Sequence, residues 1–95
     1  MMILDTKPTR QQLDNRAFWD NLPPDGAEYD GYAYTPLYSV MQDGEPIDFK
    51  TLTNSFPYDC AVREMQRQSK EHDNITLKMT GYSESLVRMD RRLTA

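Results

Sequence analysis

The chain has 95 residues, a formal net charge of −4 and 38% hydrophobic residues, which indicates one domain with a thin core over residues 1–95. Its pI of about 4.8 excludes the class of bulk nucleic-acid binders, which carry a basic face, so we expect no direct contact with nucleic acid. The single cysteine excludes an internal disulfide, and the four apolar residues that open the chain are too few for a signal peptide or a membrane span. We therefore expect a cytoplasmic protein that does not bind membranes.

A short extended lead-in precedes the first predicted helix, which covers residues 9–22. Thr9 is typical of a helix N-cap, and a Pro-Pro pair ends the pattern. We expect Phe18 and Trp19 to pack in the core, although a helix with this face can also dock into a groove. The apolar positions on the helix are Leu13, Ala17, Phe18, Trp19 and Leu22.

After a loop that begins at Asp25, alternating residues from 32 to 41 predict a strand with aromatic side chains on one face. The dipeptide Asp43-Gly44 predicts a two-residue hairpin to a second strand. Pro36 cannot donate to a ladder, so the first strand is expected at a sheet edge, or to carry a bulge there. An exposed edge can pair with another copy of the chain. The cross-strand pairs that this turn predicts are Val40 with Ile47 and Tyr38 with Phe49.

A second helix is predicted over residues 57–72, where apolar residues recur with helical spacing. Alternation over 75–80 predicts a strand that ends in a turn at Gly81. Residues 85–91 fit either a strand or a helix, and we choose a strand. The predicted order is α-β-β-α-β-β, an α+β domain of two layers in which antiparallel hairpins pack on one or two helices.

A catalytic role has little support in the sequence. Cys60 and His72 are the natural nucleophile and base, but twelve residues of helix separate them by roughly 18 Å. We interpret Cys60 as a small buried apolar residue and His72 as a helix-end residue. Two such residues are too few for zinc, and the acidic loop lacks EF-hand spacing. We therefore predict no enzyme activity, no cofactor, no metal and no catalytic residue.

Residues 17–49 hold seven carboxylates and no lysine or arginine, a formal charge of −7, while the rest of the chain carries +3. Four tyrosines fall within the same stretch. Complementary potentials steer association, and tyrosine is common in binding hot spots. The alternative is that the tyrosines are core side chains with their hydroxyls at the rim. The predicted partner-binding residues are Asp25, Glu28, Tyr29, Asp30, Tyr32, Tyr34, Asp43 and Glu45.

The first functional hypothesis is a small acidic inhibitor that covers a basic, nucleic-acid-binding surface of a partner protein, with carboxylates in place of phosphates. In size, acidity and lack of a catalytic set the chain is similar to the accessory proteins of phages and to antitoxin-like proteins, although no motif carries this resemblance. The alternative is a homo-oligomer, joined through an edge strand, that has a structural role or sequesters nucleotides. Its phosphate-binding residues would be Arg88, Arg91 and Arg92, which can also be read as a solvated terminal cluster.

Overall fold

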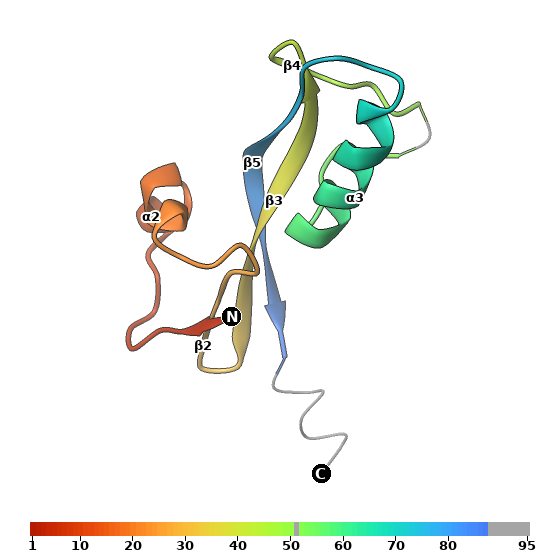
Figure 1. Cartoon of the computed structure of the whole chain (residues 1–95). Helices are drawn as coiled ribbons and strands as arrows, with labels where there is room; N and C mark the ends of the chain where they lie inside the picture. The colour runs from red at the N-terminus through yellow and green to blue at the C-terminus, as the bar shows by residue number, and fades with distance from the viewer. Residues whose placement is uncertain (51, 88–95) are drawn as a thin grey trace. The chain divides into compact units, whose positions relative to one another are not determined.

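In the computed structural model, which describes residues 1–50 and 52–87, the chain forms three helices and a sheet of five strands (Figure 1). The mixed α/β class is therefore confirmed. Within the described residues, no helix is long and apolar enough to cross a membrane. The elements are β1 (Met2–Ile3), α1 (Arg10–Leu13), α2 (Arg16–Asp20), β2 (Ala27–Tyr29), β3 (Tyr32–Gln42), β4 (Glu45–Pro46), α3 (Tyr58–Ser69) and β5 (Ile75–Leu86).

The chain divides into two compact units, which are described separately. The first combines Met1–Pro36 with the chain from Tyr82 onward, and the second is Leu37–Gly81. Strands β3 and β5 each contribute residues to both units. The expectation of one domain over the whole chain stays a prediction.

The first unit begins with β1 and two short helices, so the prediction of a single helix over 9–22 is wrong. Thr9 caps α1 through a capping box with Gln12, as the sequence indicates. Asn15 then adopts an extended backbone, and its side chain accepts a hydrogen bond from the Ala17 N–H, which starts α2. Asparagine competes with the helix in this way because its side chain can bond nearby backbone groups. The break lets the Trp19 indole donate to the Leu13 carbonyl at 2.7 Å in the buried interior, so the expected core position of Trp19 is confirmed.

Residues 25–31, expected as loop, instead contain β2 and a tight turn. Strand β2 pairs in parallel with β1, and antiparallel with β3 so that Tyr29 lies opposite Tyr32. Asp30 and Gly31, with φ values of 48° and 83°, form the turn between them. Positive φ at both central residues is the geometry that favours Asp-Gly in two-residue hairpins. The turn therefore fixes which residues of β2 and β3 face the same way.

Gly26, the residue before β2, lies close against β3. Its φ is +93°, and a Cβ at this position would lie 2.1 Å from the Tyr34 carbonyl oxygen. Only glycine fits, because any side chain would both collide with that oxygen and occupy a disfavoured backbone region.

In the second unit, the predicted Asp43-Gly44 hairpin is confirmed. The two residues have φ values of 52° and 82°, and β4 pairs with β3 in the predicted register. The Ile47 N–H donates to the Val40 carbonyl at 3.1 Å, as that register requires.

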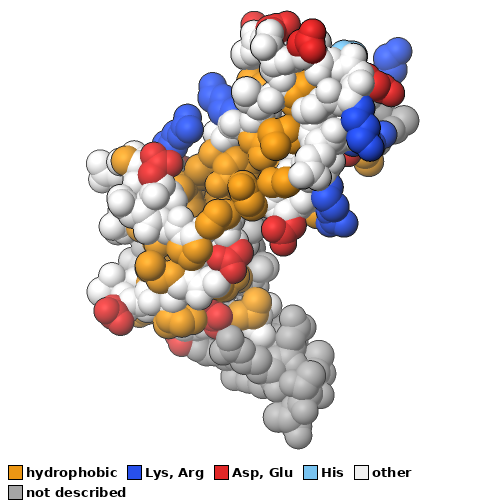
Figure 2. All heavy atoms as spheres, in the orientation of Figure 1, with side chains coloured by type: hydrophobic (Ala, Val, Ile, Leu, Met, Phe, Trp, Pro, Cys, Tyr) orange, Lys and Arg blue, Asp and Glu red, His pale blue; other side chains and the backbone are white. Residues whose placement is uncertain are grey.

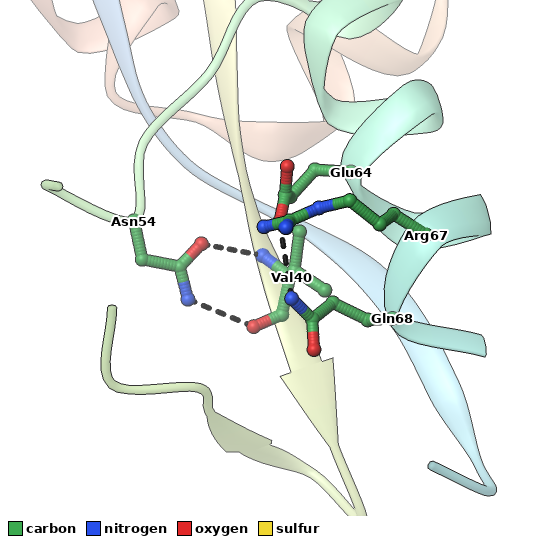
Figure 3. A network of polar contacts seen from close by, with 5 residues as sticks. All are labelled: Val40, Asn54, Glu64, Arg67 and Gln68. Carbon is green, nitrogen blue, oxygen red and sulfur yellow. Dashed lines mark hydrogen bonds and ion pairs between the residues drawn. The ribbon is translucent and has the colours of Figure 1, made fainter. Parts of the chain in front are cut away.

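The predicted pair of Tyr38 with Phe49 is wrong, because the ladder ends early. Tyr38 instead exchanges two backbone hydrogen bonds of 2.8 Å with Phe56. Between the two ladders, the Asn54 side chain takes the place of a strand residue (Figure 3). Its Oδ1 accepts from the Val40 N–H at 2.8 Å, while its Nδ2 donates to the Val40 carbonyl at 2.8 Å and to the Ile47 carbonyl at 2.9 Å.

Strand β3 is central, so the expectation that Pro36 marks an edge strand is wrong. β5 pairs with β3, while β2 and β4 pair with its opposite ends. Backbone groups alternate sides along a strand, and the Tyr38 and Val40 N–H groups donate to Phe56 and Asn54. Pro36 lies two and four residues before them, so a backbone N–H at this position would point to the same edge of β3. At Pro36 the pairing with β2 has ended and the pairing with Phe56 has not begun, so the lack of an N–H breaks no ladder.

The last helix and strand differ from expectation in three ways. Helix α3 ends at Ser69, which leaves His72 beyond the helix and exposed. Cys60 is exposed, not buried, because the core-facing residue of this turn is Ala61. The predicted turn at Gly81 is wrong, since β5 continues through it to Leu86. The strand predicted over residues 85–91 is confirmed at residues 85 and 86 and ends before residue 87. Residues 88–91 lie outside the described part of the chain.

We expect Gly26→Ala to lower the free energy of unfolding by about 2–4 kcal/mol, since it adds both a steric clash and a strained φ. Gly81→Ala is the matched control, because a Cβ there meets nothing within 4 Å; it should stay within about 0.5 kcal/mol of the parent. Urea unfolding followed by Trp19 fluorescence and far-ultraviolet circular dichroism measures both. Equal stability of the two variants would contradict the close approach of Gly26 to β3.

Candidate binding site

A pocket of about 170 Å³ lies in the first unit, at the hairpin between β2 and β3. The hairpin contributes three tyrosines and an aspartate to its wall. The other two lining residues come from distant parts of the sequence, the segment before α1 and the end of β5. The lining residues are Lys7, Tyr29, Asp30, Tyr32, Tyr34 and Glu84.

The register of the hairpin explains why the three tyrosines meet. Tyr29 lies directly opposite Tyr32, and paired residues in an antiparallel ladder point to the same face. Tyr34 is two residues further along β3, so it shares that face as well. The turn at Asp30 therefore places three aromatic rings beside each other, next to a carboxylate.

Tyr34 joins the pocket to the core of the unit. Only 2% of its surface is exposed, and its hydroxyl donates a hydrogen bond to Glu84 Oε1 at 3.4 Å. Burial, and then the negative charge and hydrogen bond of Glu84, raise the pKa of the Tyr34 hydroxyl above its ordinary value. Tyr34 thus stays protonated at neutral pH and acts as a donor that helps to position the Glu84 carboxylate.

The other predicted partner-binding residues are not in this pocket. Glu28 alternates with Tyr29 along β2 and so faces the other side of the strand. Asp25 forms an ion pair with the amino group of Met1 at 2.6 Å. Asp43 and Glu45 belong to the second unit, where the Asn74 amide donates to Asp43 Oδ1 at 2.8 Å.

Sequence reasoning missed Lys7 and Glu84. The apolar alternation changes phase at Gly81, from odd positions up to Met79 to even positions at Tyr82 and Leu86, so it does not predict that β5 continues or which of its residues lies beside Tyr34. That information is in the pairing of β5 with β3, which begins with a hydrogen bond from the Asp43 N–H to the Asn74 carbonyl in the second unit. The alternative phosphate-binding residues, Arg88, Arg91 and Arg92, lie outside the described residues.

The surface around β1 and β2 combines acidic and apolar side chains. Figure 2 shows red and orange side chains next to one another on the face in view, where the N-terminal strand lies. Ile3 is 68% exposed and Tyr32 is 40% exposed. Exposed aromatic and aliphatic groups beside carboxylates are typical of binding surfaces, whose apolar centres have polar rims.

The surroundings of Cys60 and the possible metal ligands are the other candidates for a site. Cys60 lies with Phe56, Arg63 and Glu64 around a hollow of about 350 Å³ whose lining includes no histidine. Across residues 1–50 and 52–87, no three side chains of His, Cys, Asp or Glu converge as metal ligands would. No protein-family model, no curated protein and no solved structure matches the chain. A functional proposal therefore depends on the chain's own residues.

We expect one tyrosine of the native protein to ionise with a pKa above the ordinary value of about 10. This late ionisation should be absent when Tyr34→Phe is titrated. Because the folded state holds this proton more tightly than the unfolded chain, stability should fall as the pH rises above about 10, and less steeply in Tyr34→Phe. Glu84→Gln should shift this ionisation to lower pH, while Glu71→Gln should not. Ultraviolet absorbance of tyrosinate as a function of pH measures the titration of each protein. A parent protein in which no tyrosine ionises above the ordinary pKa would contradict the assignment of the raised pKa to Tyr34.

Proposed function

We propose that the protein is a non-enzymatic binding protein that covers a basic site on a partner protein. The contact it uses is named the hairpin surface and comprises Tyr29, Asp30, Tyr32 and Glu84 at the pocket, together with Asp25 and with Glu28 on the other side of β2. The observation that supports this proposal is the pocket, because its wall combines three tyrosines with two carboxylates on a structured hairpin. Inhibition would follow from occlusion, with carboxylates in the place of phosphates and tyrosine rings in the place of bases.

The charge of the hairpin surface suits a basic partner. Complementary potentials accelerate encounter and disfavour wrong partners. Exposed charges are screened at a distance of about 8–10 Å at physiological ionic strength, so an association of this kind weakens as salt is added. Asp43 and Glu45, in the second unit, remain proposed partner-binding residues. A cytoplasmic location remains part of the proposal.

The tyrosines suit the centre of such a contact. Tyrosine presents a large apolar ring with a polar tip, and it loses little conformational entropy on binding. Aromatic rings that are buried at the centre of an interface, with charged residues around them at the rim, contribute most of the binding energy. The arrangement of Tyr29 and Tyr32 around the turn provides this combination.

Neutralising the hairpin surface tests the proposal. The variant Asp25→Asn, Glu28→Gln, Asp30→Asn removes three charges and keeps a residue at position 30 that tolerates its φ of 48°. The control variant Asp48→Asn, Glu71→Gln, Asp73→Asn removes three charges from exposed positions of the second unit. We expect the first variant to lose binding by at least about tenfold, or 1.4 kcal/mol, and the control to lose less than about threefold.

The measurement has two steps. Affinity purification of the tagged chain at low and at high salt first identifies a stoichiometric protein released by salt. Isothermal calorimetry with that purified protein then compares the parent, the hairpin variant and the control. Equal binding by all three proteins, or a partner that high salt does not release, would contradict the proposal.

The outer edge of β1 favours a second candidate function, self-association through strand pairing. β1 is the terminal strand of the order β1-β2-β3-β4. The Met2 and Leu4 N–H groups donate inward to Gly26 and Glu28 at 3.2 and 2.8 Å. Backbone groups alternate along a strand, so those of Ile3 point away from β2, where another strand can pair with them.

If copies of the chain pair through β1, Ile3→Pro should make the protein monomeric. Proline at this position removes an outward donor and leaves the inward bonds of Met2 and Leu4 in place. Ile3→Ala is the control that shortens the side chain and keeps the donor. Sedimentation equilibrium over a range of protein concentrations measures the association. A parent that is monomeric throughout, or an Ile3→Pro variant that still associates, would rule out this edge.

A further inference from the structure

We infer that the pocket of the hairpin surface receives an arginine side chain of the partner protein. This inference depends on the proposed function, because it names the group that the hairpin surface recognises. It commits the site to a guanidinium and not to a phosphate or a neutral group. Three features of the pocket support it: its size, its aromatic wall and the place of its carboxylates.

The size of the pocket suits one side chain. Its volume is about 170 Å³, whereas pockets that take drug-sized ligands measure roughly 300–1,000 Å³. This volume favours a single long side chain over a nucleotide as the group held within the pocket.

The wall of the pocket is suited to a cation. Tyr29 and Tyr32 contribute aromatic rings, whose faces attract a positive charge. Arginine uses such a wall better than lysine, because its planar guanidinium stacks on rings and is less strongly hydrated than an ammonium group. The three rings come from one face of one hairpin, so they are in place before a ligand arrives.

The carboxylates of the pocket provide the counter-charge. Glu84 accepts a hydrogen bond from the Tyr34 hydroxyl, and a carboxylate can accept about four such bonds in all. The hydroxyl therefore orients Glu84 and leaves it able to receive N–H groups. Arginine presents its donors in a fixed fork that matches a carboxylate, which gives paired, charge-assisted hydrogen bonds. Asp30, which is exposed, adds a second negative charge to the wall of the pocket.

Lys7 is the cation among the residues that line the pocket. Lys7 lines the same pocket as Asp30 and Glu84, so we expect it to compete with a guanidinium for these carboxylates. Removing the charge in Lys7→Gln should then tighten arginine binding by about twofold to fivefold, since like charges at close range are unfavourable. A pocket for phosphate would respond in the opposite direction, because it would lose its cation.

The test uses the full chain and N-acetyl-arginine methylamide as the probe, followed by nuclear magnetic resonance. We expect the ring signals of Tyr29, Tyr32 and Tyr34 to shift with a dissociation constant in the millimolar range. N-acetyl-citrulline methylamide has the same shape without the charge and should cause no shift at equal concentration. N-acetyl-lysine methylamide should bind at least about threefold more weakly than the arginine probe.

Variants locate the bound probe. Glu84→Gln should weaken arginine binding by about tenfold, the equivalent of one lost charge-assisted hydrogen bond, and Glu71→Gln in the second unit should leave it unchanged. The citrulline comparison is made on the parent protein, so the test does not depend on the folding of a variant. Equal shifts with citrulline, equal affinity for lysine, or weaker arginine binding in Lys7→Gln would each overturn the inference.

The two proposals fail in different ways. If the arginine probe does not bind but neutralising Asp25, Glu28 and Asp30 still abolishes partner binding, the hairpin surface is correct and the pocket assignment is wrong. If the probe binds with the expected selectivity but the neutralised variant keeps its partner, the pocket recognises a guanidinium and the proposed function is wrong.

Discussion

The pairing of β3 with its neighbours is the constraint on which the rest of the structure depends. Asp-Gly turns precede and follow this strand, and each holds two consecutive residues at positive φ. These turns set the registers of β2 and β4, which pair with opposite ends of β3. A shift of one residue in either register would turn every side chain of that partner strand to the opposite face. The position of the tyrosines around the pocket is thus a consequence of the turn at Asp30 and Gly31, and the close approach at Gly26 maintains it.

One of these turns could be predicted from the sequence, and the same reasoning should have found the other. Apolar residues that alternate on both sides of Asp43-Gly44 predict a hairpin there, and the structure confirms it. Asp30-Gly31 is the same dipeptide between two tyrosines, but the many acidic residues and glycines around it are typical of a loop. The difference lies in the sequence beside each turn: Ile47 and Phe49 continue an alternating apolar pattern after Asp43-Gly44, whereas before Asp30-Gly31 the alternation covers only Ala27 to Tyr29.

Other differences arise from asparagine side chains that bond backbone groups in place of a helix or a ladder. Asn54 ends one ladder by bonding Val40 and Ile47, and Asn15 divides a helix whose apolar spacing continues across the break. Local propensity cannot foresee the first effect, because the amide and its acceptors are far apart in the sequence. The composition of residues 17–49 located most of the pocket wall, but Lys7 and Glu84 enter through tertiary pairing. Composition also predicts Glu28 at the site, although alternation along β2 turns it away from the face that carries Tyr29.

The link between Tyr34 and Glu84 makes the site and the core of the first unit depend on one another. A buried hydroxyl without a partner costs free energy, so the Glu84 carboxylate stabilises Tyr34 in the interior. The same charge raises the pKa of the hydroxyl. A guanidinium beside Glu84 would offset that charge, and the pKa of Tyr34 would then move back toward its ordinary value. By linkage, an arginine should bind more tightly to the form of the protein in which Tyr34 is ionised. Ionisation of this one hydroxyl would therefore report occupancy of the pocket from inside the core, without a label on either molecule.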